Sequence, residues 1–163
     1  MNLFAGSQTE LFLRLFVSLI LGALIGIERT VAHKSAGIRT FGLVSLGSAL
    51  FVVISEMINV RYAGVMSPDH LRIPSQIVVG IGFLGAGLII LSESKLKGLT
   101  TAAGLWVCAG IGMAIGLGFY ELAIFSTILA IFILVGLWFL EEKVKKISPN
   151  QESDKNDFSS KYN

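Results

Sequence analysis

Three closely spaced glycines, Gly80, Gly82 and Gly85, form the pattern G-x-G-x-x-G. In soluble enzymes this pattern follows a strand, opens a helix and binds a dinucleotide, and an acidic residue about twenty positions later binds the ribose. Here the glycines lie inside an uncharged apolar run from Ile77 to Leu91, and the corresponding downstream stretch, Leu105-Trp106-Val107, carries no carboxylate. The context favours a membrane helix whose glycines let neighbouring helices approach closely. We therefore expect no nucleotide cofactor.

Charged residues at the ends of two apolar segments are the first candidates for a polar site. Glu28 and Arg29 follow the first segment, and Arg39 opens the second after a short loop. A helical hairpin would bring Glu28 and Arg39 to one level near the membrane surface, where an ion pair could organise a polar site. Arg29 competes for Glu28, but adjacent residues point about 100° apart around a helix. The alternative is that these arginines only anchor helix ends.

Threonines extend this candidate site. Thr40 follows Arg39, and Thr100 and Thr101 begin the fourth apolar segment. Hydroxyl groups at a helix start commonly accept hydrogen bonds from free backbone N–H groups, so capping is the alternative to a functional role. The candidate functional polar site comprises Glu28, Arg29, Arg39, Thr40, Thr100 and Thr101.

The other acids, the histidines and the cysteine show no pattern typical of an enzyme or a metal site. Cys108 lies in an apolar segment, and His33 and His70 fall in different loops. A divalent-cation pathway needs several converging carboxylate or carbonyl oxygens, whereas the acids here are divided between the two membrane sides. We predict that the protein is not an enzyme and has no cofactor and no metal site.

The composition indicates a membrane protein. Of the 163 residues, 53% are hydrophobic and 15% are charged, which is more apolar surface than a soluble chain of this length can bury. A spanning helix needs about 20 apolar residues, and the third segment reaches this length only with its flanks. The sequence predicts an all-α membrane protein, a polytopic bundle of five transmembrane helices. The five segments are Leu11–Ile27, Thr40–Met57, Ile77–Leu91, Leu99–Leu117 and Leu122–Leu140.

Lysines and arginines are distributed unequally about these spans. With the N-terminus outside and the C-terminus cytoplasmic, eight of them face the cytoplasm, and two, Arg61 and Arg72, face outside. This distribution follows the positive-inside rule. The eight are Arg29, Lys34, Arg39, Lys95, Lys97, Lys143, Lys145 and Lys146. Residues 1–146 form the predicted transmembrane domain, and the polar residues 147–163 form a predicted disordered cytoplasmic tail.

Small residues mark the predicted helix-packing faces. Ser18, Gly22 and Gly26 recur every four residues and share one face of the first helix. The fifth segment has few small residues, so we expect it to be peripheral and to face lipid. The glycines assigned to helix packing are Gly22, Gly26, Gly80, Gly82, Gly85, Gly87, Gly112 and Gly116.

Four separated sequence blocks occur in a recognisable order. They are Gly22–Arg29, Ala36–Thr40, Gly80–Gly87 and Gly98–Ala103, followed by Trp106, Gly112 and Gly116. In this combination and spacing, the chain from about Leu11 to Tyr120 resembles the MgtC/SapB family of bacterial inner-membrane proteins.

The resemblance implies a small multi-pass protein of the bacterial cytoplasmic membrane. Members similar to MgtC are linked to growth at low magnesium and to survival inside macrophages, and they act as regulators through other membrane proteins, including the F-type ATP synthase. The implied partners are the lipid bilayer and other integral membrane proteins. A homo-oligomer is a further expectation, and the net charge of +2 is too small to indicate a nucleic-acid partner. The alternative is a transporter or channel for a small ion or solute, with a polar site at the cytoplasmic ends of the first, second and fourth helices.

Overall fold

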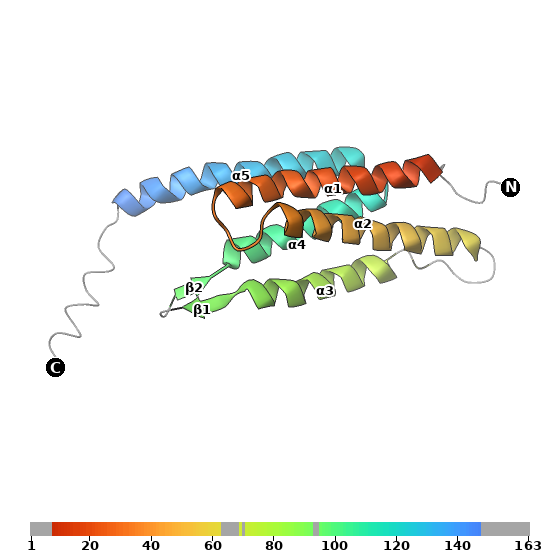
Figure 1. Cartoon of the computed structure of the whole chain (residues 1–163), viewed down its shortest axis with the longest axis horizontal. Helices are drawn as coiled ribbons and strands as arrows, with labels where there is room; N and C mark the ends of the chain where they lie inside the picture. Colours follow the sequence, from red (N-terminus) through yellow and green to blue (C-terminus); the bar gives the residue numbers. More distant parts are fainter. Residues whose placement is uncertain (1–7, 63–68, 70, 93–94, 148–163) are drawn as a thin grey trace. The chain divides into compact units, whose positions relative to one another are not determined.

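The computed structural model describes residues 8–62, 69, 71–92 and 95–147, which form five α-helices and one short β-hairpin (Figure 1). The elements are α1 (Gln8–Val31), α2 (Ile38–Arg61), α3 (Arg72–Leu88), β1 (Ile90–Ser92), β2 (Lys95–Lys97), α4 (Leu99–Gly116) and α5 (Tyr120–Ile147). The chain divides into two compact units, Met1–Ala130 and Ile131–Asn163, so that the boundary lies inside α5.

Four of the described helices are long and apolar enough to cross a membrane. They are α1, α2, α4 and the Tyr120–Leu140 part of α5, whereas α3 is apolar but has only 17 residues. The protein is therefore an all-α polytopic membrane protein, as the composition predicted.

The third predicted segment, Ile77–Leu91, extends at its start, as its shortness required, but the prediction is wrong at its end. The helix begins earlier, at Arg72, where the Asp69 carboxylate accepts hydrogen bonds from the backbone N–H groups of Leu71 and Arg72, at 3.2 and 3.1 Å. It ends at Leu88, because Ile89 adopts an extended backbone and β1 begins at Ile90. β-branched residues favour extended backbone, and β1 pairs antiparallel with β2. Hydropathy alone could not distinguish the strand from a last helical turn.

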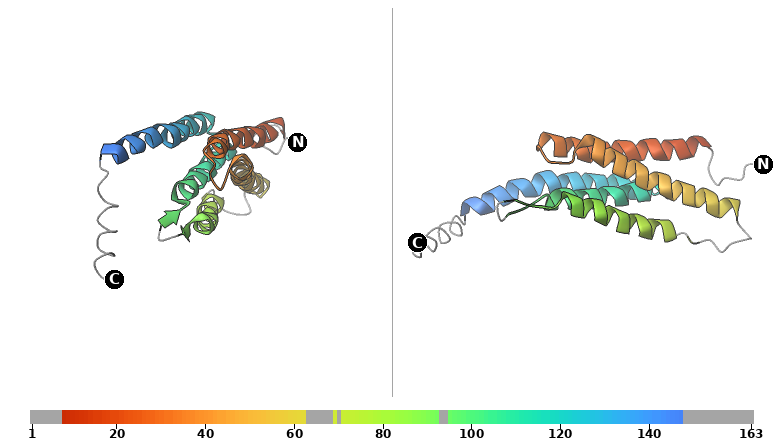
Figure 2. Two further views of the ribbon diagram at one scale, coloured as in Figure 1. Left: turned by 60° about the vertical axis from the view of Figure 1, so that its left-hand side comes forward. Right: turned by 60° about the horizontal axis from the view of Figure 1, so that its bottom comes forward.

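The first unit has a core made by α1, α2 and α4, which lie side by side, with α3 against α4 (Figure 2). Close contact between α1 and α2 depends on two glycines of α1. A Cβ atom at Gly22 would lie 2.6 Å from the carbonyl oxygen of Phe41, and one at Gly26 would lie 2.6 Å from the Cα of Ile38. The stripe predicted on α1 is therefore the buried one. Its buried residues are Arg14, Ser18, Leu21, Gly22, Ile25, Gly26 and Arg29.

Two glycines of α4 make the equivalent contact with α2. A Cβ atom at Gly112 would overlap the carbonyl oxygen of Ser45, and one at Gly116 would lie 2.8 Å from the Cβ of Val52. The backbones of α2 and α4 therefore meet directly, which is the geometry that small residues permit in membrane helix pairs. Cys108 adds a hydrogen bond, since its thiol donates to the carbonyl oxygen of Phe41 at 3.2 Å.

The glycines of α3 do not pack as predicted. Gly85 is buried, and a Cβ atom on Gly85 would lie 3.7 Å from the Cβ of Ala102. Gly80, Gly82 and Gly87 are exposed, and a Cβ atom on any of them would meet no atom within 4 Å among the described residues. The prediction is wrong for these three because α3 packs against α4 along a single strip, and glycine density does not indicate which strip that is.

The two parts of α5 belong to different units. In the first unit, Ala123 and Thr127 are buried, and the Thr127 hydroxyl donates to the Ala123 carbonyl oxygen at 2.8 Å. In the second unit, the described residues 131–147 continue the helix past Leu140, with large apolar side chains such as Phe132 and Trp138 exposed. This exposure fits a lipid-facing helix. Ile147, the first residue of the predicted disordered tail, is still part of α5, and the rest of that tail, 148–163, lies outside the described residues.

Candidate functional site

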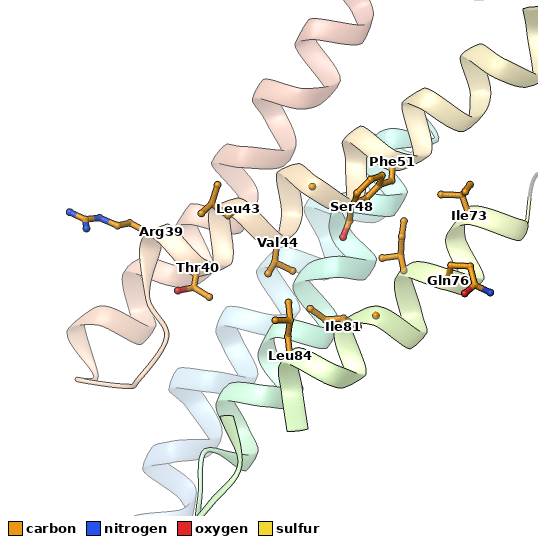
Figure 3. Close-up of a pocket in the computed structure, with 13 residues that line it drawn as sticks. Arg39, Thr40, Leu43, Val44, Ser48, Phe51, Ile73, Gln76, Ile81 and Leu84 are labelled. Carbon is orange, nitrogen blue, oxygen red and sulfur yellow. The ribbon is translucent and has the colours of Figure 1, made fainter. Parts of the chain in front are cut away.

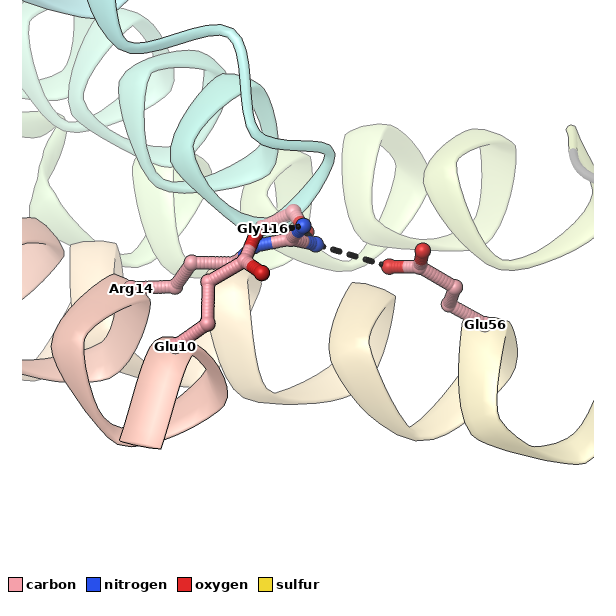
Figure 4. A network of polar contacts seen from close by, with 4 residues as sticks. All are labelled: Glu10, Arg14, Glu56 and Gly116. Atoms are coloured by element: carbon pink, nitrogen blue, oxygen red, sulfur yellow. Dashed lines mark hydrogen bonds and ion pairs between the residues drawn. The ribbon is translucent and has the colours of Figure 1, made fainter. Parts of the chain in front are cut away.

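A buried arginine joins three helices at one end of the core. Arg14 of α1 is 8% exposed, and its guanidinium contacts the Glu56 carboxylate of α2 at 2.8 Å and the Glu10 carboxylate of α1 at 2.6 Å. It also donates to the carbonyl oxygen of Gly116 at the C-terminus of α4, at 2.9 Å. Figure 4 shows these groups meeting at the Arg14 guanidinium. We call this set, Glu10, Arg14, Glu56 and Gly116, the Arg14 cluster.

The chemistry of the Arg14 cluster explains why a charge is tolerated in a membrane helix. Carbonyl groups in the last turn of a helix lack intrahelical donors and carry the negative end of the helix dipole, so a guanidinium is favoured there. Two carboxylates offset the desolvation cost of the arginine, as ionisable groups within membrane segments require. Gly118, with φ of +84°, lies beside this guanidinium, and a Cβ there would be 3.3 Å from an Arg14 nitrogen.

From its place in the small-residue stripe, Arg14 was expected either to face protein or to reach the outer membrane surface, and the structure shows it buried. The sequence analysis did not identify its partners. Glu10 stands four residues before Arg14, which is a spacing that pairs opposite charges on a helix. That signal was available in the sequence. Glu56 and Gly116 are far from Arg14 in sequence, 42 and 102 residues away. Only the packing of α1, α2 and α4 reveals them.

At the other end of α1, Glu28 pairs with its neighbour Arg29 and not with Arg39. The Glu28 carboxylate contacts both Nε and a terminal nitrogen of Arg29, the latter at 2.5 Å, and the Arg29 side chain is 3% exposed. The expected Glu28–Arg39 pair is therefore wrong. The 100° argument concerns Cα positions, whereas both side chains are long enough to turn toward each other. Arg39 is exposed and forms no ion pair within the described part of the chain.

Thr30 joins the end of α1 to the start of α2, which sequence reasoning missed. Its hydroxyl donates to the Gly26 carbonyl oxygen at 2.9 Å and accepts from the backbone N–H of Ile38, the first residue of α2, at 3.2 Å. The hydroxyl lies against Gly37, where a Cβ atom would overlap it. A threonine in the last turn of a helix, with a glycine before the next helix, was the available signal.

The three threonines of the predicted site lie in different environments. Thr101 is buried, Thr100 is exposed, and Thr40 is exposed on the surface of α2. The predicted capping role is not observed for Thr100 and Thr101, because the N-cap of α4 is Gly98 in a left-handed conformation and no side chain caps that helix. Among the six predicted residues, the described polar contacts join only Glu28 with Arg29.

A groove of about 710 Å³ separates α2 from α3, and Arg39 and Thr40 line one end of it (Figure 3). We call it the α2–α3 groove. Its walls include Val44 and Phe51 of α2, and Gln76, Gly80 and Leu84 of α3. Within the described residues, no three His, Cys, Asp or Glu side chains gather as metal ligands would.

A family model and individual relatives both place the chain in one protein family. The sequence model of the MgtC family matches residues 15–143. "Putative magnesium transporter YhiD" from Escherichia coli (strain K12) is 43% identical over 130 residues, which cover 77% of this chain and 59% of YhiD. Protein SapB from Bacillus subtilis (strain 168) is 38% identical over 152 residues, which cover 90% of this chain and 63% of SapB.

Protein MgtC from Salmonella typhimurium (strain LT2) is 40% identical over 144 residues, which cover 88% of this chain and 59% of MgtC. The chain thus spans between 59% and 63% of the length of these relatives. No solved structure matches the chain.

Proposed function

Because the chain belongs to the MgtC family of membrane proteins, we propose that it is a non-enzymatic regulator that acts through contacts with other membrane proteins. The names of the relatives MgtC and YhiD support a role connected with magnesium. In this proposal the protein takes part in adaptation to low magnesium or stress, and it does not itself carry Mg²⁺.

The Arg14 cluster is the observation that supports this choice. Magnesium binds carboxylates and retains several waters in near-octahedral geometry. In the membrane bundle, the carboxylates of Glu10 and Glu56 are already held by the Arg14 cation at 2.6 and 2.8 Å. A divalent cation would have to displace that guanidinium or lie beside a like charge. The direct backbone contacts at Gly22 and Gly112 further fill the interior of the first unit.

Large apolar side chains outside the core offer a surface for membrane partners. Phe83 of α3 is 82% exposed and Phe125 of α5 is 64% exposed. Aromatic residues on a helix face contribute strongly to contacts with a partner. The same side chains also suit contact with lipid, so the partner must be identified by experiment.

The second candidate function is transport of a small ion or solute. It is supported by the name of YhiD and by the buried arginine–carboxylate pairs at both ends of α1, because ionisable groups within membrane segments often serve ion or proton pathways. With the proposed orientation, N-terminus outside and C-terminus cytoplasmic, the Arg14 cluster is near the outer surface and the Glu28–Arg29 pair near the cytoplasm.

Site-specific photocrosslinking in native membranes tests the regulator proposal. A photoreactive amino acid replaces Phe83 or Phe125, and the control replaces Ile115, which is fully buried. We expect a discrete protein adduct from an exposed position, stronger after growth in low magnesium, and none from Ile115. Adducts with lipid alone from both exposed positions, under low and high magnesium, would contradict the proposal.

A further inference from the structure

The α2–α3 groove has mostly apolar walls, with the polar Thr40, Ser48 and Gln76 among them, and a basic residue at one end (Figure 3). We propose that it binds one acyl chain of an anionic phospholipid, with the headgroup phosphate at Arg39. This lipid site is independent of the regulator proposal, because it concerns a different surface and needs no protein partner.

The length of the groove indicates a lipid chain as the occupant. On α2 the lining runs from Arg39 to Phe51 and on α3 from Ile73 to Leu84. At about 1.5 Å per residue, these stretches are roughly 18 and 16 Å long. One leaflet contributes half of a hydrocarbon core of about 30 Å, or roughly 15 Å. The groove therefore matches the depth of one leaflet, whereas a transmembrane helix of a partner would need a contact surface about twice as long.

The chemistry at the Arg39 end favours an anionic headgroup. Arg39 is exposed, and its guanidinium points away from the apolar walls in Figure 3, while its residue still lines the groove. Glu28, the acid that the sequence analysis assigned to Arg39, is instead held by Arg29. Arg39 is also the second residue of α2, where the positive end of the helix dipole adds to its charge. A guanidinium in this position can bind two oxygens of a phosphate.

Two glycines keep the groove open. Gly47 of α2 and Gly80 of α3 both line it, and a Cβ atom on either would meet no atom within 4 Å in the described structure. Larger side chains at these positions would extend into the groove without striking a neighbouring backbone. The glycine at position 80, which does not serve helix packing, has an explanation here, since it leaves space for a lipid chain.

Gly82 provides a matched control for Gly80. It lies on the same helix, is also exposed, and would also place a Cβ in open space, but it does not line the groove. Gly80→Leu should therefore fill the groove, and Gly82→Leu should leave it open. Both changes replace a helical glycine by a good helix former, so we expect both variants to fold.

Native mass spectrometry of the full chain, purified in detergent with equal phosphatidylglycerol and phosphatidylcholine of the same acyl chains, tests the proposal. We expect the wild type and Gly82→Leu to retain one phosphatidylglycerol, and Gly80→Leu to lose it. Arg39→Gln should reduce the preference for phosphatidylglycerol about fivefold, the effect of one basic residue near an anionic surface. Excess glycerol 3-phosphate, which has the headgroup anion without acyl chains, should not displace the lipid.

Three results would overturn the lipid site. One is equal retention of lipid by Gly80→Leu and Gly82→Leu. Another is an unchanged headgroup preference in Arg39→Gln. The third is a second copy of the chain, in place of lipid, bound to the wild type and lost from Gly80→Leu, which would identify the groove as an interface between copies.

Discussion

Replacing Gly112 by alanine should destabilise the protein, although alanine is the better helix former. A Cβ atom at Gly112 would overlap the Ser45 carbonyl oxygen and lie 2.9 Å from the Ser45 Cα. These are backbone atoms of α2, so the helices must move apart to relieve the overlap. Inserting one carbon into a well-packed interior typically costs about 1–3 kcal/mol, and the helix-propensity gain of about 1 kcal/mol for Gly→Ala offsets part of this cost.

Gly110 is the matched control for this prediction. It lies two residues before Gly112 in α4, and a Cβ atom there would meet no described atom within 4 Å. Gly110→Ala should therefore be neutral or stabilise by up to about 1 kcal/mol. The difference between the two variants isolates the α2–α4 contact. This difference in stability is measured by unfolding both variants in mixed micelles. Circular dichroism records the loss of helix as the fraction of denaturing detergent increases. Equal stability of Gly112→Ala and Gly110→Ala would refute the direct α2–α4 contact.

Three further outcomes follow from the polar contacts and the charge distribution. Glu56→Gln should lower the free energy of unfolding by about 1–3 kcal/mol, because Arg14 loses one of two carboxylates. The same detergent unfolding measures this loss, and Glu121→Gln, at an exposed position, should change the unfolding midpoint little. Thr30→Val removes both hydrogen bonds at the α1–α2 junction and should cost about 1–2 kcal/mol; faster amide exchange at Ile38 would show the loss, and unchanged exchange would count against the cap. A cytoplasm-active reporter fused after Lys146 should be active, and activity only of a periplasmic reporter there would reverse the proposed orientation.

The sequence predicts the features that depend on local periodicity. The stripe of Ser18, Gly22 and Gly26 on α1 is buried, as its four-residue spacing indicated. Arg14, which begins that stripe, faces protein for the same reason. Such patterns are visible because a helix repeats its faces every few residues.

The errors arise where the outcome depends on neighbours that the sequence does not identify. Gly80 and Gly82 share a helix with the buried Gly85, yet only Gly85 contacts α4. The partner of Glu28 was assigned by Cα direction, and the length of two adjacent side chains reversed the result. Arg14 and Glu56 lie on different helices and are 42 residues apart in sequence, so no local pattern reveals their contact.

In the proposed function, the protein regulates through contacts and does not carry Mg²⁺. The most direct test of this proposal is Mg²⁺ entry into proteoliposomes containing the full chain and an internal magnesium indicator, with Mg²⁺ ionophore as the positive control. We expect Mg²⁺ entry no faster than in protein-free liposomes, for the wild type and for Glu56→Gln alike. Saturable entry that increases with the amount of wild-type protein, and that Glu56→Gln abolishes, would contradict the proposal and assign the Arg14 cluster to a transport pathway.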